Sequence, residues 1–388
     1  MLLGKKFLGI SMNQSLKREV RQVMPSKKTV GWVVGTILVL GGGGYALAKY
    51  NTNSMAHVMY QRITHTADHS IQSAKSQQTH SDKQTTSTSS STEVDTGAVR
   101  KLLTEKKFDG AYLVLEDGKM SKTKYIGSNQ DQLKDKYFQI ADLENAVTAA
   151  AVLKLVDQGK LKLSTPVSHY YDSLDVSSDV TVGDLLKMTS GLSNSSIPNN
   201  QLSNVLEWNV NHTNSGNSDS YDYQETNYVL LEGIISQVTN GSYQDYINQA
   251  ILKPNHLNQV KFVPSINDNR LATPYNGKEK VDNPTLAKAM NEQMGKNQLM
   301  ATPAGMMKLT QVLVKDYGDN KNFTAGRNFT GQLMKDESKY YGSGGIVGYR
   351  TSVAISKDGK KGIVLMSNHS NGKDNMTGLV KESYDKLN

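Results

Sequence analysis

Apolar and polar positions divide this chain into three parts. The nineteen residues Val30–Ala48 contain no charge, and at about 1.5 Å per residue a helix of this length spans roughly 28 Å, close to the hydrocarbon core of a membrane. Residues 49–96 are poor in apolar side chains and rich in Ser, Thr, Gln and His. Apolar residues return in a patterned way from Gly97. The pattern predicts a membrane helix (30–48), a low-complexity stalk (49–96) and a folded domain (97–388).

The charges before the apolar run predict its orientation. Residues 1–29 contain seven basic residues and one acidic residue, and positive charge accumulates on the cytoplasmic side of membrane helices. We therefore expect 1–29 to be a cytoplasmic basic tail, 30–48 to be a single-pass signal anchor in the cell membrane, and 97–388 to be extracellular. A cleaved signal peptide is the alternative, because Ala46-Leu47-Ala48 has the small-x-small form of a cleavage site. Either reading exports the rest of the chain.

Charge and composition also exclude several kinds of partner. The tail accounts for most of the net charge of +8, so the folded domain is close to neutral and no nucleic-acid partner is expected. The chain has no cysteine, which removes disulfides and thiolate metal sites. His65 and His69 lie four residues apart in the stalk, but a zinc site needs further ligands nearby, so a solvated stalk is the better interpretation. We expect no metal and no cofactor.

The folded domain has strand patterns at both ends and helix patterns between them. Two strands are predicted within Ala111–Gly127, joined at Asp117-Gly118, and two more within Gly348–Asn368, since Asp-Gly between apolar runs is a hairpin signal. Helices are predicted at Asp142–Gly159, 182–191, 227–241 and 302–318, with a last one closing the chain. Strands from distant segments imply one antiparallel sheet with helices packed on it, so the fold class is α+β.

The same segments carry a resemblance to a known family. In order along the chain they read FQIADLENAVTAAAVLKLVDQGKLKLSTPVSHYY, VTVGDLLKMTSGLSN, YQETNYVLLEGII, ATPAGMMKLTQVL and GSGGIVGYRTSVAISKDGKKGIVLMSN. This order resembles the serine β-lactamase-related family, in the branch of class C β-lactamases, DD-peptidases and related esterases, over nearly all of residues 98–388. The resemblance implies a β-lactamase/DD-peptidase-like antiparallel sheet flanked by helices, with an inserted helical region.

Members of that family work by acyl transfer through a serine in Ser-x-x-Lys, where the lysine lies on the same helix face and helps to remove the serine proton. The run Thr148–Ala151 fixes the register of this helix. It places Asp142 at the position of the family serine and Asn145 at the position of the family lysine. The resemblance therefore implies that the nucleophile and its cation have been replaced.

The two other family motifs are altered as well. The resemblance places Tyr-x-Asn on Tyr223-Gln224-Glu225, which retains the tyrosine but has glutamate in place of asparagine. Lys-Thr-Gly or His-x-Gly falls on Gly342-Ser343-Gly344, which lacks the basic first residue. These changes turn a cationic cleft into an anionic one, so carboxylate ligands should bind poorly. The predicted pocket residues are Asp142, Asn145, Tyr223, Glu225, Ser343, Gly344 and Gly345.

Several chemical roles are open for these residues. Asp142 as a carboxylate nucleophile lacks the neighbouring cation, whereas at a helix start it would accept unpaired backbone N–H groups. Asp142 and Glu225 could act as a general acid and base, but Tyr223 is the only other residue of the motifs that supports such chemistry. For Tyr223 itself, a role in packing and hydrogen bonding is the better interpretation. Ser-x-x-Lys also occurs at Ser121 and at Ser383, outside the family motifs, where chance spacing explains it.

We therefore expect a non-catalytic binding or regulatory protein displayed on the cell envelope, with a cell-wall peptide or an envelope protein as its partner. The alternative is a serine-hydrolase-family enzyme, such as a carboxypeptidase, an esterase or a β-lactamase-like enzyme, that acts on cell-wall peptides with altered catalytic residues. A third reading is a scaffold that binds a partner through its outer surface alone. Covalent labelling by penicillin or a fluorophosphonate separates the enzyme from the two other readings.

Overall fold

The computed structural model describes most of the chain from residue 94 to residue 387. The internal gaps are 129, 195–196, 198–204, 217–219, 266, 292–297, 321–328, 331–332 and 371–374. The predicted tail (1–29), the predicted membrane helix (30–48) and nearly all of the predicted stalk (49–96) lie outside the described residues. Among the residues that are described, no helix has the length and apolar character needed to cross a membrane.

The largest element is an antiparallel sheet whose strands follow the order β11-β12-β13-β14-β15-β1-β2, with β3 also paired to β1. The first long strand pairs with the last one, Ala111 opposite Met366, so segments from the two ends of the domain lie side by side in the sheet. The strands are β1 (Gly110–Glu116), β2 (Lys119–Met120), β3 (Lys124–Ile126), β11 (Phe329–Thr330), β12 (Leu333–Lys335), β13 (Lys339–Ile346), β14 (Tyr349–Ser356) and β15 (Gly362–Ser367).

Both predicted hairpins are present. Glu116 pairs with Lys119 around Asp117-Gly118, and Gly359 lies in the turn between β14 and β15. Gly118 and Gly359 have φ values of 76° and 70°, in the left-handed region that glycine adopts without a steric penalty. The turn residues therefore set the register of both hairpins, as the sequence predicts.

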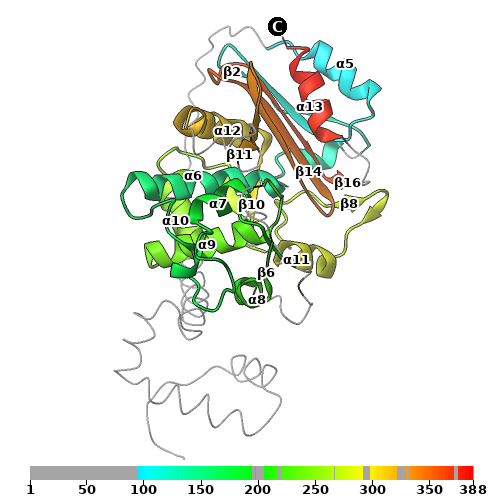
Figure 1. Ribbon diagram of the computed structural model, residues 1–388. Coiled ribbons are helices and arrows are strands. Elements are labelled where there is room, and N and C mark those ends of the chain that lie inside the picture. The colour runs from blue at the N-terminus through cyan, green and yellow to red at the C-terminus, as the bar shows by residue number, and fades with distance from the viewer. Residues whose placement is uncertain are drawn as a thin grey trace, which may run out of the picture. The chain divides into compact units, whose positions relative to one another are not determined.

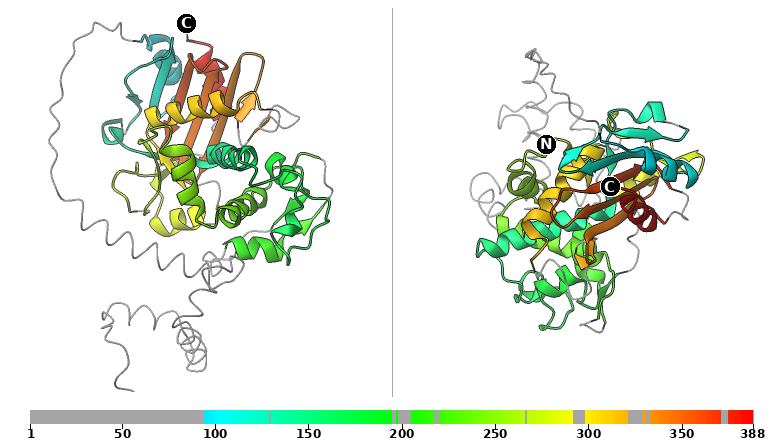
Figure 2. Two further views of the ribbon diagram at one scale, coloured as in Figure 1. Left: turned by 90° about the vertical axis from the view of Figure 1, so that its left-hand side faces the viewer. Right: turned by 90° about the horizontal axis from the view of Figure 1, so that it is seen from above.

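Helices cover both faces of the main sheet (Figure 1). Along β1, Tyr112 and Val114 pack with α5 (Gly97–Glu105) and α13 (Met376–Tyr384). Ala111, Leu113 and Leu115 belong to the main core on the other face, which α12 (Pro303–Tyr317) crosses, as the left view of Figure 2 shows. The side chains of a strand alternate between faces, so one apolar strand serves two cores.

The region inserted between β3 and α12 is mainly helical, and it lies below α12 in the view of Figure 1. Its helices are α6 (Glu144–Asp157), α7 (Val182–Lys187), α8 (Val205–His212), α9 (Thr226–Thr239), α10 (Tyr243–Ile247) and α11 (Asn283–Asn291), the 3-10 turns are η2 (Gln130–Leu133), η3 (Ala141–Leu143) and η4 (Val167–His169), and the π-helical turn is η6 (Asn248–Leu252). The small sheets are β4-β10-β7 (Phe138–Gln139, Leu299–Ala301, Val260–Phe262), β16-β8-β9 (His369–Ser370, Tyr275–Asn276, Glu279–Lys280) and β5-β6 (Leu192–Ser193, Asn214–Ser215).

Helix α6 is central because it is buried on all sides. Eleven of its residues, from Glu144 to Leu155, are buried, which explains why its sequence is almost uniformly apolar rather than amphipathic. The helix packs in the main core with α9, α10 and α12. The α+β class and the antiparallel sheet with its helical region are confirmed, and this burial fixes the position of the turn that precedes α6.

Candidate functional site

The site begins at the turn η3, which connects β4 to α6. Ala141 has a φ of 53°, a conformation that costs a residue with a side chain free energy and that needs surrounding structure to hold it. Strand β10 provides this support, because the Ile140 N–H donates to the Leu299 carbonyl at 3.1 Å and the Leu299 N–H donates to Oε2 of Glu144 at 2.8 Å. The turn that carries Asp142 is thus held on both sides.

The Asp142 carboxylate bonds to groups from two other parts of the domain. Oδ2 accepts a hydrogen bond from the backbone N–H of Gly345 at 3.1 Å, and Oδ1 accepts one from the Tyr223 hydroxyl at 3.3 Å. The N-cap residues of η3 and α6, Ile140 and Leu143, make no side-chain cap bond. The sequence predicts that Asp142 accepts backbone N–H groups at a helix start, and the Gly345 N–H that it accepts belongs to strand β13.

Asn145 joins the same hydrogen-bond network one helical turn further on. Its side chain is fully buried, and Nδ2 donates to the Tyr223 hydroxyl at 3.3 Å. Its Oδ1 is buried and has no hydrogen-bond partner. The Tyr223 hydroxyl therefore accepts from Asn145 and donates to Asp142, and three of the predicted pocket residues are in direct contact.

Gly344 is the position where strand β13 packs against the turn. A Cβ atom on Gly344 would lie 2.6 Å from the Asp142 nitrogen and 2.9 Å from both the Ile140 carbonyl oxygen and the Leu143 nitrogen. These atoms are backbone and cannot rotate away. Only glycine allows the strand to approach the turn closely enough for Gly345 to reach the Asp142 carboxylate.

Ser343 and Glu225 occupy the margins of the network. The Ser343 Oγ lies 2.6 Å from Oγ1 of Thr377 on α13, and successive side chains of a strand point to opposite faces. Ser343 thus directs its hydroxyl away from the face on which Gly344 meets the turn, in contrast to the expectation that it faces the pocket. Glu225 is exposed and is the N-cap residue of α9, where its side chain makes no cap bond.

Glu144 was missed by sequence reasoning, although it lies between Asp142 and Asn145. Its carboxyl group is fully buried and accepts from the backbone of Gln298 at 2.6 Å and of Leu299 at 2.8 Å, and from the Tyr243 hydroxyl at 3.2 Å. Burial is the dominant effect and raises the pKa of Glu144 to about 7. An acidic residue in the first turn of an otherwise apolar helix was the only signal in the sequence.

The serines outside the family motif have structural contacts. Ser190 Oγ donates to Oδ1 of Asn227 at 2.6 Å and accepts from the Leu192 N–H at 3.1 Å, which stabilises the turn after α7. Ser121 Oγ accepts from the backbone of β1. Ser383 is fully buried within α13, and its hydroxyl has no hydrogen-bond partner. The contact of Ser121 and the burial of Ser383 agree with the interpretation that the Ser-x-x-Lys spacings at these two serines arise by chance.

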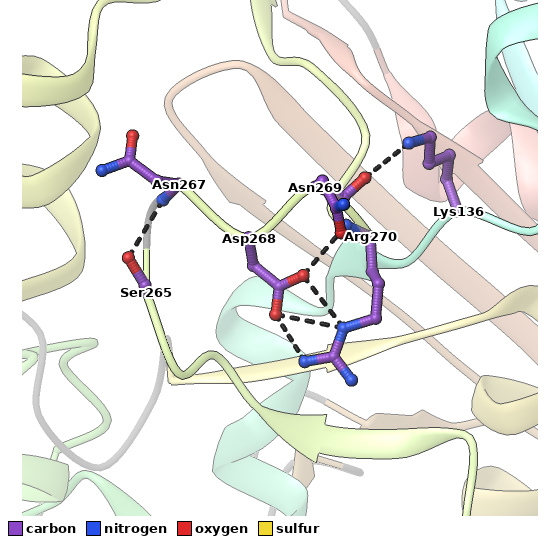
Figure 3. Close-up of polar contacts among 6 residues, drawn as sticks. All are labelled: Lys136, Ser265, Asn267, Asp268, Asn269 and Arg270. Carbon is purple, nitrogen blue, oxygen red and sulfur yellow. Dashed lines mark hydrogen bonds and ion pairs between the residues drawn. The ribbon is translucent and has the colours of Figure 1, made fainter. Parts of the chain in front are cut away.

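Two hollows of the domain lie elsewhere. One of about 380 Å³ is lined by Asp131, Gln132, Leu133, Lys134, Lys136, Thr273 and Asn368, and one of about 210 Å³ is lined by His256, Leu257, Asn258, Gln259, Gly305 and Lys308. In the first, Lys136 donates to the Asn269 carbonyl next to the Asp268–Arg270 ion pair (Figure 3). Neither hollow includes a predicted pocket residue, and no group of potential ligands in the described part of the chain is arranged to hold a metal.

Comparison with known proteins identifies the family. The β-lactamase family model matches residues 96–380, which include the turn η3, α6, α9 and strand β13. The chain belongs to the β-lactamase family. The matched residues include most of the described structure, so the hydrogen-bond network around Asp142 lies inside the family domain.

Individual relatives agree with this assignment. The chain is 24% identical over 298 residues to a putative penicillin-binding protein, PbpX, of Bacillus subtilis, covering 69% of this chain and 73% of PbpX. It is 29% identical over 178 residues to protein flp of Staphylococcus aureus, covering 41% of this chain and 35% of flp, so the match spans only about a third of that relative.

Solved structures show the same fold. FmtA from Staphylococcus aureus matches with a TM-score of 0.65 at 18% identity, covering 83% of this chain and 95% of FmtA. The D-amino acid amidase from Ochrobactrum anthropi, in complex with L-phenylalanine amide, matches with a TM-score of 0.61 at 19% identity, covering 75% of this chain and 96% of the amidase. At these identities the likeness establishes the fold alone, and any statement about activity has to be argued from the residues of this chain.

Proposed function

We propose that this chain is a catalytically silent member of the β-lactamase family that binds a ligand of the cell envelope while anchored in the membrane. The similar protein PbpX is named as a putative penicillin-binding protein, which supports a ligand from the cell wall. The observation that carries the proposal is the hydrogen bond from the Gly345 N–H to the Asp142 carboxylate.

Serine acyl transfer needs backbone donors for the oxyanion that forms on the substrate carbonyl. Gly345 offers such a donor on strand β13, but this N–H is bonded to Asp142 at 3.1 Å. Asp142 also occupies the position that the family resemblance assigns to the nucleophile. A carboxylate therefore lies where a developing oxyanion would need positive potential, and the two negative charges would repel each other.

Proton removal from a nucleophile lacks support as well. Asn145 stands at the position assigned to the family lysine and is an amide that donates to Tyr223. The segments that form the site, 138–148, 221–228 and 342–348, contain four acidic residues and no lysine or arginine. With no lysine or arginine in these segments, the retained Tyr223 hydroxyl has a positioning role, since it links Asn145 to Asp142.

Intact-mass spectrometry of the purified full-length chain tests this proposal. The chain is incubated with a penicillin and, separately, with a fluorophosphonate, and an active DD-peptidase, which retains the penicilloyl group on its serine, serves as the labelled control. We expect no mass increase in this chain. An acyl or phosphonyl adduct on any serine would contradict the proposal and support the alternative of an enzyme with altered catalytic residues.

The membrane anchor rests on the uncharged run at 30–48 and the basic tail before it. Protease treatment of intact cells that express the chain with a tag at each end tests it. We expect loss of the C-terminal tag, protection of the N-terminal tag and recovery of the protected piece in the membrane fraction. Release into the medium of a piece that carries the C-terminal tag and lacks the N-terminal tag would instead support cleavage after Ala48.

A further inference from the structure

The hollow of about 380 Å³ is formed by three segments that lie far apart in the sequence. They are the turn η2 with the residues that follow it, the segment at Thr273, and Asn368 directly after β15. Nδ2 of Asn368 donates to the Thr273 carbonyl at 2.7 Å, and the Asn368 carbonyl accepts from the Tyr275 N–H at 2.8 Å. Leu133 of η2 is buried in the main core. The walls of the hollow are therefore held by fixed contacts, and its volume is within the range of small-ligand sites, about 300 to 1,000 Å³.

Two lysines line this hollow, and neither forms an ion pair with a carboxylate of the described residues. Lys136 donates to a neutral acceptor, the Asn269 carbonyl, at 2.5 Å, and Lys134 is exposed. Figure 3 shows the nearby Arg270 guanidinium directed at Asp268, with which it forms an ion pair. An ammonium group has three donors, so both lysines have donors and positive charge to offer to a ligand.

Asn368 brings an acceptor without a donor to the same lining. Its side chain is only 2% exposed, and Oδ1 has no hydrogen-bond partner in the described part of the chain. A buried acceptor of this kind costs free energy unless a bound molecule supplies a donor. Asp131 adds one negative charge to the lining, so the hollow favours a ligand with a single negative charge over one with two.

We infer that this hollow is a second binding site, and that its ligand is a monocarboxylate with an N–H next to the carboxylate, as in the C-terminal residue of a peptide. The carboxylate pairs with the ammonium groups of Lys134 and Lys136. The N–H supplies the donor that Oδ1 of Asn368 lacks. This inference goes beyond the proposed function and does not depend on it, because the lining of the hollow includes no residue of the network around Asp142.

Saturation-transfer NMR at pH 7 with the full-length chain tests the inference. The probe is N-acetylalanine, whose carboxylate is ionised at this pH. N-acetylalaninamide keeps the N–H and lacks the charge, whereas propionate keeps the carboxylate and lacks the N–H. We expect N-acetylalanine to bind at least about tenfold more tightly than either compound, as the loss of one charge-assisted or one buried hydrogen bond implies.

Lysine variants assign the binding to the hollow. Lys134→Gln with Lys136→Gln should weaken the binding of N-acetylalanine by at least about tenfold and leave that of N-acetylalaninamide unchanged. Lys134→Gln alone alters an exposed side chain, so the variant should keep the melting temperature of the unaltered chain and weaken binding by a smaller factor. Lys308→Gln is the matched control, because Lys308 is exposed and lines the other hollow, and it should change nothing.

Several results would overturn the inference. Equal binding of N-acetylalanine and N-acetylalaninamide would show that the lysines do not select a carboxylate, and equal binding of propionate would show that the N–H has no acceptor in the site. Tighter binding of inorganic phosphate than of N-acetylalanine would contradict the preference for one negative charge. Full binding by the double lysine variant, or an equal loss in Lys308→Gln, would place the ligand outside this hollow.

Discussion

The backbone N–H of Gly345 donates a hydrogen bond of 3.1 Å to the carboxylate of Asp142, 203 positions away in the sequence. This bond joins the main sheet to the turn that leads into the buried helix α6. Asp142, which the resemblance places at the position of the family nucleophile, therefore accepts a hydrogen bond from strand β13.

The first prediction is that two substitutions do not restore acyl transfer. Asp142→Ser with Asn145→Lys recreates Ser-x-x-Lys and frees the Gly345 N–H. Glu225 and Gly342 still differ from the family motifs, so we expect acylation by penicillin to remain slow. Stopped-flow kinetics with a chromogenic β-lactam measures this, and brisk turnover by the double variant would refute the prediction.

The second prediction concerns the close approach of β13 to the turn. Gly344→Ala places a methyl group 2.6 Å from the Asp142 nitrogen, and overpacking against backbone costs about 1 to 3 kcal/mol of unfolding free energy. Gly241→Ala is the control, because its nearest neighbouring atom would lie at 3.9 Å. Urea unfolding should show a large loss for Gly344→Ala only, and equal stabilities of the two variants would show that the strand does not touch the turn.

The third prediction uses the buried Glu144. Burial raises its pKa from an ordinary value of 4.5 to about 7, so the folded domain holds this proton more tightly than the unfolded chain does. Its contribution to stability is complete below pH 4.5 and is lost as the pH rises through about 7, a change on the order of 3 kcal/mol.

Glu144→Gln removes the titrating group, and its amide oxygen still accepts from the Gln298 and Leu299 N–H groups, while its NH2 group faces the Tyr243 hydroxyl, which can accept. We expect the free energy of unfolding of this variant to lose most of its dependence on pH between 4.5 and 7. Glu105→Gln, on the exposed face of α5, should keep the dependence of the unaltered chain. Parallel curves for all three proteins would mean that Glu144 does not titrate in this range.

Local patterns in the sequence predicted much of the fold. The Asp117-Gly118 and Asp358-Gly359 turns set two hairpins, and the apolar run after Asp142 gave α6, because turn chemistry and apolar spacing act over short distances. The predicted start of this helix, Asp142, was less accurate, because Ala141–Leu143 form a 3-10 turn and α6 begins at Glu144. Tertiary contact with β10 decides that boundary.

Contacts between distant segments could not be derived from spacing alone. The motif positions indicated that Asp142, Asn145 and Tyr223 belong to one site, but the donor to Asp142 is the backbone of Gly345, which no side-chain pattern reveals. The direction of Ser343 depends on strand register against α13. Glu144 gains its raised pKa from full burial, which only the assembled domain shows.

A crystal structure of the chain after incubation with a fluorophosphonate tests the central claim most directly. We predict that Asp142 keeps its hydrogen bond to the Gly345 N–H, and that every serine of the domain remains unmodified. A phosphonyl group bonded to a serine, or a serine hydroxyl in contact with Tyr223 or a lysine beside Asp142, would contradict the account.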